Sequence, residues 1–554
     1  MKKLLVVLLI ACLVFAFAAC GSGDQTPSET PDSPDSTSDS PETSAASEGG
    51  SIFRTTQTIM PEWDPAVGSD YASCVIMCNV FDTLVFPTED GGVEPWVAES
   101  WTISEDGLTW DFKLREDVYF HSGNQLTADD VKYSMDRLCE IGEGFAYLFY
   151  DYVDSVEVID DFNVRFHCTQ AYGPLLNSLV RFYIVDQELL EANYAEGDYG
   201  DKGDYGKGFL LTSDAGSGPY TVDSVSTNIS VGGTIFPEYW AGVDENNPEK
   251  YIVYASNDAV TVKTMMSRQE LECTDMWQAA ENIESIMAAD DSLKLTFNYT
   301  GGGVNLWMNN QRAPMDDPQI REAFGYLIDY ATVCSSILPD SIQKDSVIPS
   351  NLLGFEEVFD FSFDLEKAQD AISRSTYADT IGDMEIELVW NSESADREKI
   401  ALMIQAAASQ IGLNVKIVEL PWSTIVANSA DIEQSPMMTL TSITPVTADS
   451  GSQFVSLLRT KEAGTWENMN WVNDPELDAL IDAALLLTDE AERAAAYGEI
   501  QRYCGERFTF VPIAESPERL VYQASYVEME PRIGLQGFSY YLRDIYVYPD
   551  QRAQ

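Results

Sequence analysis

The side chains that most often perform catalysis or bind metals are few and widely spaced in this sequence. His121 and His167 are its two histidines, and seven cysteines follow Cys20 at irregular spacing. Cys74 and Cys78 are four residues apart, which is one face of a helix, but no CxxC pair occurs. The GxSxG and HExxH motifs of hydrolases are absent as well. These observations predict no zinc site, no cofactor and no catalytic residues.

Two groups of acidic residues could in principle hold a cation, but both have simpler explanations. Asp198, Asp201 and Asp204 are three residues apart in a glycine-rich segment, unlike the alternating ligands of a calcium loop. Asp316 and Asp317 stand directly before a proline and an apolar helical pattern, which is typical of a helix start. We therefore expect a solvated loop at the first group, a helix cap at the second, and no metal site.

A short N-terminal segment has the character of an export signal. Lys2 and Lys3 precede an apolar run over residues 4–17, which is too short for a spanning helix, since that needs about 20 apolar residues. Small residues then lead into Cys20, and the segment resembles the bacterial lipobox, whose cysteine is diacylated and becomes the mature N-terminus. We expect residues 1–19 to be a signal peptide and Cys20 to be a lipid anchor outside the cytoplasm. The alternative is an ordinary cleaved signal with an incidental cysteine.

The composition separates a linker from a globular body. Residues 24–48 contain no aromatic, branched aliphatic or basic residue, so they cannot bury enough apolar surface to offset the entropy of ordering. We expect residues 20–50 to be a disordered acidic linker that follows the lipidated cysteine. The remaining body of about 500 residues is long enough for two or three domains. The net charge of −59 disfavours nucleic acid and anionic lipid head groups as partners.

Local patterns predict a small antiparallel unit over residues 86–208. Residues 108–115 and 162–168 alternate between apolar and polar side chains, which indicates half-buried strands. Residues 153–159 precede an Asp-Asp turn and are typical of a third strand. Thr127, followed three residues later by an aspartate, predicts the start of a helix. This unit should therefore combine antiparallel strands with helices.

The second half of the chain has the pattern of an α/β lobe. Residues 385–390 and 414–420 are predicted strands, and residues 397–411 form a predicted helix between them. A strand, helix and strand joined by short links imply a parallel pair with a right-handed crossover. The predicted fold class is thus mixed α/β.

Nine short motifs follow one another along nearly the whole chain after residue 52. They are DPA at 64–66, EPWVAESW at 94–101, SEDGLTWDFKLR at 104–115, FHSG at 120–123, LTADDV at 126–131, GSGPY at 216–220, PMDDPQIREAF at 314–324, GLNV at 412–415 and NDPELDALI at 473–481. In this order they resemble the family 5 extracellular solute-binding proteins, which are the peptide/nickel-type receptors of ABC importers.

The resemblance implies a two-lobed clamshell of the periplasmic-binding-protein type, with an extra antiparallel α+β subdomain. Lobe I would be discontinuous, and the subdomain would be inserted in it. Hinge crossings are expected near Asn309 and Tyr526. The implied domains are residues 51–85, 209–308 and 526–554 for lobe I, 86–208 for the inserted subdomain, and 309–525 for lobe II.

The resemblance also implies which residues touch the ligand. In family members that take peptides, an aspartate of the second lobe binds the ammonium group, and Asp449 stands in the matching context; a helix N-cap is the alternative. Arg397 lies where a dipeptide receptor carries an arginine for the carboxylate, and a surface helix arginine is the alternative. The residues expected to line the cleft, with burial in the core as the alternative for each tryptophan, are Thr58, Ile59, Met60, Trp422, Trp390 and Trp240.

The implied function is capture without turnover. The protein would be a monomeric, lipid-anchored receptor that closes on an oligopeptide or dipeptide outside the cell and delivers it to the permease subunits of an ABC importer, with no enzymatic activity. Two alternatives stay open: a receptor of the same family for another solute, such as an oligosaccharide, an opine or a metal chelate, and a receptor that senses peptides.

Overall fold

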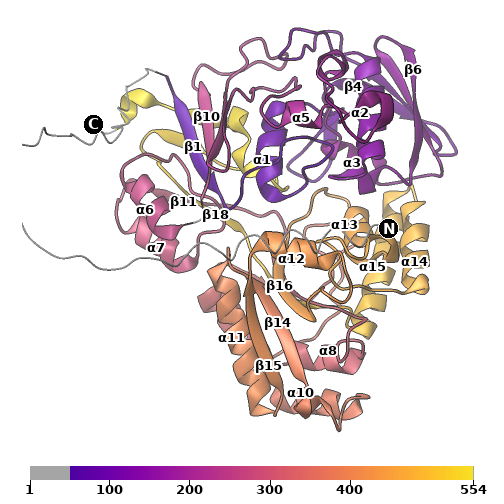
Figure 1. Ribbon diagram of the computed structural model, residues 1–554, viewed down its shortest axis with the longest axis vertical. Coiled ribbons are helices and arrows are strands. Elements are labelled where there is room, and N and C mark those ends of the chain that lie inside the picture. The colour runs from indigo at the N-terminus through magenta and orange to yellow at the C-terminus, as the bar shows by residue number, and fades with distance from the viewer. Residues whose placement is uncertain (1–49, 257, 553–554) are drawn as a thin grey trace, which may run out of the picture. The chain divides into compact units, whose positions relative to one another are not determined.

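Sheets of four, six and four strands organise the chain in the computed structural model, which describes residues 50–256 and 258–552 (Figure 1). The predicted signal peptide, Cys20 and nearly all of the predicted linker lie outside the described residues. Within the described ranges, no helix has both the length and the apolar character that crossing a bilayer requires.

The antiparallel unit predicted in the first half is present. Its sheet has the strand order β4-β5-β7-β6, and all neighbours are antiparallel. The alternation in β5 is confirmed, because Trp110, Phe112 and Leu114 are buried. α2 (Ala128–Ile141) packs on β6 and begins after Thr127, whose backbone N–H donates to Asp130. The strands are β4 (Ala98–Ile103), β5 (Thr109–Leu114), β6 (Val153–Asp160) and β7 (Asn163–Cys168).

A second four-stranded sheet has the order β1-β10-β9-β8 and contains the first strand of the described chain. β1 runs parallel to β10, and β9 runs antiparallel to both β10 and β8. β1 ends directly before Thr58, so its end sets the position of the segment 58–60. The elements are β1 (Ile52–Gln57), β8 (Ser224–Ser226), β9 (Ser230–Thr234), β10 (Lys250–Ala255), α1 (Tyr71–Val80), α6 (Ala259–Ser267) and α7 (Ala280–Met287).

The six-stranded sheet confirms the predicted crossover. β14 pairs in parallel with β15 and with β16, and α11 packs against all three strands (Figure 1). Ile400, Ala401 and Ile404 of α11 are fully buried against them, as expected for the apolar face of a crossover helix. The elements are β12 (Gly303–Met308), β13 (Ile342–Gln343), β14 (Glu385–Asn391), β15 (Asn414–Leu420), β16 (Met438–Ile443), β17 (Val511–Glu515) and α11 (Ala395–Gln410).

Two antiparallel strands, β11 (Lys294–Asn298) and β18 (Glu518–Tyr522), lie where the chain enters and leaves this sheet. β12 follows β11 after four residues and pairs with β16 and β17, so the chain joins the six-stranded sheet at Gly303, before the predicted crossing near Asn309. The predicted domain bounds remain a prediction. Two further strand pairs are β2 (Val85–Pro87) with β3 (Val93–Pro95), and β19 (Val527–Met529) with β20 (Ile545–Val547).

The remaining helices pack around the six-stranded sheet or connect the units. Asp317 caps α8 by accepting the backbone N–H of Gln319, as predicted from the Asp-Pro pattern. The long α15 ends at Phe508, which adopts a left-handed conformation with φ 48°. These helices are α8 (Pro318–Gly325), α10 (Leu365–Arg374), α12 (Trp422–Ser429), α13 (Gly451–Leu458), α14 (Pro475–Leu485) and α15 (Glu490–Arg507), with the short α3 (Leu175–Ser178), α4 (Gln187–Glu191), α5 (Lys207–Leu210) and α9 (Tyr330–Thr332).

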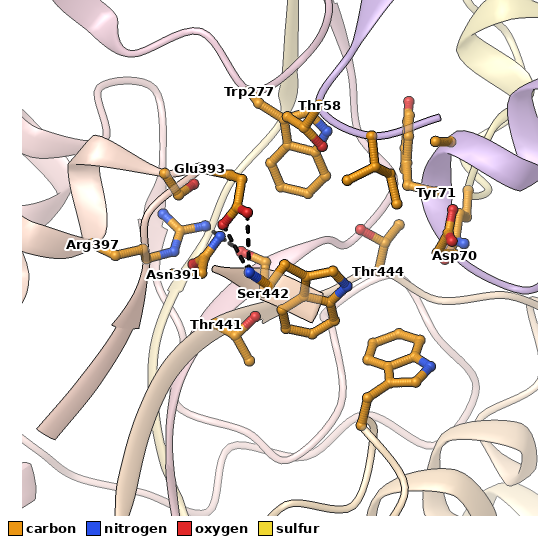
Figure 2. A pocket seen from close by; sticks show the side chains of 16 residues that line it. Thr58, Asp70, Tyr71, Trp277, Asn391, Glu393, Arg397, Thr441, Ser442 and Thr444 are labelled. Atoms are coloured by element: carbon orange, nitrogen blue, oxygen red, sulfur yellow. Dashed lines mark hydrogen bonds between the residues drawn. The ribbon is translucent and has the colours of Figure 1, made fainter. Parts of the chain in front are cut away.

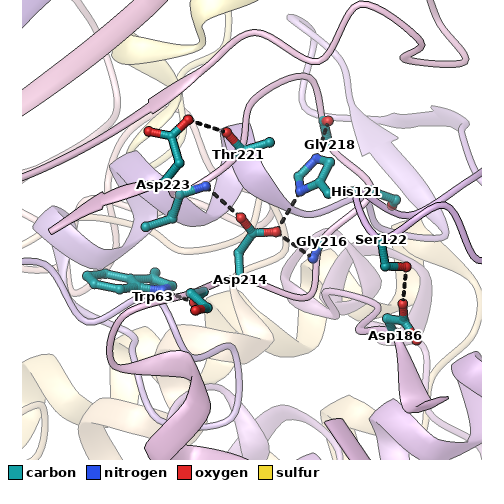
Figure 3. A network of polar contacts seen from close by, with 12 residues as sticks. Trp63, His121, Ser122, Asp186, Asp214, Gly216, Gly218, Thr221 and Asp223 are labelled. Atoms are coloured by element: carbon teal, nitrogen blue, oxygen red, sulfur yellow. Dashed lines mark hydrogen bonds and ion pairs between the residues drawn. The ribbon is translucent and has the colours of Figure 1, made fainter. Parts of the chain in front are cut away.

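A buried ion pair joins the FHSG motif to the GSGPY motif (Figure 3). Nδ1 of His121 lies 2.6 Å from Oδ1 of Asp214, and Nε2 lies 2.9 Å from the carbonyl oxygen of Gly218. Both partners are acceptors, so both ring nitrogens donate and the imidazole is protonated. Burial alone would lower the pKa of His121, but the bonds to Asp214 and Gly218 raise it above its usual value.

This raised pKa gives a sign for the pH dependence of stability. The stabilisation of the folded protein by protonated His121 is fully present below the unfolded pKa of about 6.5, and it is lost as pH rises through the higher folded pKa. Between these two pKa values the loss is about 1.4 kcal/mol per pH unit. We expect the free energy of unfolding of wild type to fall more steeply above pH 6.5 than that of His121→Gln. Urea unfolding at a series of pH values measures both slopes. Equal slopes for wild type and His121→Gln would contradict the assignment.

Candidate functional site

A candidate site opens where three neighbouring parallel strands end. Asn391 and Glu393 stand at and after the end of β14, Trp422 follows β15, and Ser442 lies near the end of β16. The carboxyl ends of parallel strands meet at one edge of a sheet, which is where open α/β sheets bind ligands. The opposite wall comes from the N-terminal part of the chain, through Thr58 after β1 and the first turn of α1.

The resulting cavity spans about 760 Å³, part of which is open to solvent. Two aromatic pairs form much of its wall. Tyr71 and Trp277 pack edge to face with ring centroids 5.9 Å apart, and Trp422 and Trp466 do so at 5.6 Å. Such surfaces pack on varied apolar groups at low entropic cost. The lining residues are Thr58, Ile59, Asp70, Tyr71, Ala72, Trp277, Asn391, Glu393, Ser394, Arg397, Trp422, Thr441, Ser442, Thr444, Trp466 and Gln536.

Arg397 brings an unpaired positive charge to this cavity. It lies in the first turn of α11 and is only 6% exposed. One guanidinium nitrogen, Nη2, donates to Oγ of Ser442, while Nε has no hydrogen-bond partner among the described residues. Burial lowers the pKa of Arg397 to about 10, although Asp396 opposes this effect. The group is therefore still charged at neutral pH and lacks a bound carboxylate, which suits it to receive an anion.

Two carboxylates also face the cavity, each at a helix start. Asp70 caps α1 through a bond of 2.9 Å from the backbone N–H of Ser73 to Oδ1, and burial raises the pKa of Asp70. Both oxygens of Glu393 accept the backbone N–H of Trp422, at 3.0 and 3.1 Å. Figure 2 places Arg397 and Asp70 at opposite ends of the cavity, with Trp277 and Thr444 between them. Asp70 thus gives the cavity an acidic end opposite Arg397, while Glu393 lies beside Arg397.

The structure brings four of the predicted site residues together. Thr58, Ile59, Arg397 and Trp422 all line the cavity. Met60 and Trp390 are absent from its lining; Trp390 is only 6% exposed on β14. Trp240 lies elsewhere, where its indole donates to Asp82 and stacks under Arg115. A role in ligand binding stays a prediction for all of these residues.

Asp449 lies outside the cavity lining, in a buried ion pair. Its Oδ2 accepts Nε of Arg493 at 3.0 Å, and its Oδ1 accepts the hydroxyl of Tyr497 at 2.6 Å and the backbone N–H of Gly451 at 2.8 Å. The side chains of Asp449 and Arg493 are 1% and 6% exposed. The carboxylate thus has three partners within the protein, and its assignment to a ligand ammonium remains a prediction.

Several cavity residues were missed by sequence reasoning. Glu393 follows the predicted strand 385–390, so inspecting the residues after each strand of the parallel sheet could have found it. Asp70 precedes an apolar helical run, so its sequence context indicates a helix cap and not a binding site. Trp277 and Trp466 lie in irregular segments, where no periodic pattern distinguishes a cleft aromatic from a core aromatic.

Comparison with known proteins identifies the family of the chain. Residues 92–465 match the family described as "bacterial extracellular solute-binding proteins, family 5 Middle". A probable D,D-dipeptide-binding periplasmic protein of Escherichia coli is 24% identical over 454 residues, covering 79% of this chain and 83% of the relative. Heme-binding protein A of Haemophilus influenzae is 24% identical over 544 residues, covering 93% and 94%.

A solved structure shows that the resemblance extends to the fold. A dipeptide-binding protein of a Pseudoalteromonas species, in complex with Met-Leu, superposes with a TM-score of 0.78 at 20% identity, covering 90% of this chain and all of that chain. The two-lobed periplasmic-binding architecture expected from the motifs is therefore confirmed. Since the family match covers more than half of the sequence, the chain belongs to the family 5 bacterial extracellular solute-binding proteins.

Proposed function

We propose that this protein captures short peptides outside the cell for an ABC importer. The observation that carries the proposal is the buried, unpaired Arg397 at one end of a cavity walled by two aromatic pairs. A peptide carboxylate would supply the missing counter-ion, and the charge-assisted bonds would form out of water, where they are strong. Peptide-binding relatives at 24% and 26% identity are consistent with this ligand class.

The acidic end of the cavity would receive the ammonium group. Asp70 lies at the end opposite Arg397, and its carboxylate can accept further bonds beyond that of its cap, whereas Glu393 lies beside Arg397. Asp449 remains the candidate from the motif comparison. Between the two charged ends, Thr58 and Ile59 follow the end of β1, where their backbone groups can pair with an extended peptide.

Capture would work by closure of two lobes. Tyr71 begins α1, whereas Trp422 begins α12 directly after β15 of the six-stranded sheet, so the two aromatic pairs lie on separate parts of the chain. A ligand that touches both pairs would favour the closed form by its differential affinity. The proposal also includes a monomeric state and the lobe bounds implied by the family resemblance. It further includes a lipid anchor at Cys20 and the linker 20–50 that follows it. The closed protein would then deliver its peptide to the permease without chemical change.

Calorimetric titration with three related ligands tests the proposal. A free dipeptide such as Ala-Phe is expected to bind, and its C-terminal amide should bind at least about tenfold more weakly, because the amide offers Arg397 no charge. N-acetylation should weaken binding in the same way through the acidic end. The control titrations use haem, maltose and nickel with histidine. Tight binding of one of these and none of any peptide would overturn the proposal.

A further inference from the structure

A second cavity, with about 590 Å³ of space between its atoms, adjoins the first. The two share five lining residues, among them Trp277, Arg397 and Ser442. The second cavity continues past Arg397 toward Gly302, directly before β12, and toward the segment that leads into β18. A group bound to Arg397 therefore stands at the boundary between the two spaces.

Arg519 lines this second cavity from β18. Its side chain is half-buried, and no hydrogen bond or ion pair joins it to any of the described residues. Burial lowers its pKa, and four carboxylates that lie farther away, among them Asp396 and Asp340, oppose that effect without bonding to it. Arg519 is thus a second guanidinium, beside Arg397, that lines a cavity without a counter-ion.

The charge of the one acidic lining residue, Asp396, is offset in part by a lysine that Asp396 shares with a second carboxylate. Asp396 lines the space, but its Oδ1 accepts Nζ of Lys399 at 3.1 Å, and Lys399 also bonds both oxygens of Glu281. Ser341, Ser516 and Thr444 add hydroxyl groups to the lining. An anion entering the cavity would therefore meet two arginines without a bonded counter-ion, several hydroxyl groups, and one carboxylate whose charge Lys399 offsets in part.

We infer that the second cavity is a subsite for a second carboxylate, so that the protein prefers peptides ending in Asp or Glu. The inference rests on the proposed peptide function. The terminal carboxylate would bind Arg397 at the boundary, and the acidic side chain of the same residue would extend past it to Arg519. The bulk of the peptide would stay in the first cavity, between the aromatic pairs.

Calorimetry with Ala-Glu and Ala-Gln tests the subsite, because the two peptides have nearly the same shape and differ by one charge. Wild type should bind Ala-Glu about tenfold more tightly than Ala-Gln. Arg519→Gln should abolish this preference and leave the affinity for Ala-Gln within about twofold, which also shows that the variant is folded. Arg519→Lys should keep part of the preference. Arg268→Gln, which removes one charge from an exposed side chain, is the matched control and should keep all of it.

The outcomes separate the two proposals. Equal affinity of wild type for both peptides, or a preference that survives in Arg519→Gln, would overturn the subsite and leave the peptide function intact. Failure of wild type to bind either peptide, or Ala-Phe, would overturn the peptide function and the subsite with it.

Discussion

Arg397→Gln is expected to weaken dipeptide binding about 30- to 100-fold, equivalent to about 2–3 kcal/mol. The guanidinium is 6% exposed, and its Nε has no partner among the described residues, so its bonds to a ligand carboxylate would form in a site with little water. The glutamine stays polar but carries no charge. Calorimetry with Ala-Phe measures the change.

The same substitution should not unfold the protein. A buried cation without a counter-ion costs free energy in the empty protein, so its removal should leave the melting temperature unchanged or raise it. Arg374→Gln removes an arginine that pairs with Glu322 and Asp370 at the surface, and it should leave peptide affinity unchanged. An Arg397→Gln variant with the wild-type dissociation constant would contradict the carboxylate role, whatever its melting temperature.

The parts of the fold that the sequence predicted are those with a local cause. The alternation of residues 108–115 specifies β5, because side chains on a strand point to opposite faces. Asp317 before Pro318 specifies the start of α8 through a cap within three residues. The parallel pair β14 and β15 follows from two strands and one helix joined by short links.

Predictions failed where the deciding contact lies far away in sequence. The apolar run over residues 508–513 enters a strand only at Val511, because α15 continues to Arg507 and Phe508 ends that helix in a left-handed conformation. The cavity unites residues near positions 58, 277, 397 and 536, and no local pattern states that these segments meet. Motif order supplied Thr58, Ile59, Arg397 and Trp422, whereas Trp277 and Trp466 required the tertiary structure.

The surroundings of Asp449 also combine one local contact with contacts to residues far away in sequence. Its position before α13 fits the predicted N-cap alternative only through the backbone N–H of Gly451, at 2.8 Å. Its strongest partners come from α15, where Arg493 and Tyr497 are one turn apart and buried. Two polar residues on the buried face of a predicted helix signal a partner, but they do not identify it.

Asp449→Asn is expected to lower the free energy of unfolding by about 3–5 kcal/mol, because it leaves the buried guanidinium of Arg493 without a counter-ion. The surface pair of Lys416 with Glu385, exposed by 57% and 59%, is the matched control, and Glu385→Gln should cost less than about 1 kcal/mol. Urea unfolding measures both. The double variant Asp449→Leu with Arg493→Met should be less destabilised than the sum of the single changes, since no charge is then left unpaired.

Binding separates this structural role from the role predicted by the motif comparison. If Asp449 acts only within its ion pair, Asp449→Asn should bind Ala-Phe within about twofold of wild type at temperatures where the variant is folded. If it also receives the ligand ammonium, the dissociation constant should rise about 30-fold, as for loss of any buried charge-assisted bond. The acetylated dipeptide gives an independent test, because it lacks the ammonium group. If Asp449 binds the ligand ammonium, Asp449→Asn should not weaken the binding of the acetylated dipeptide any further. Asp70→Asn, tested with the same peptides, identifies the carboxylate at the acidic end of the cavity.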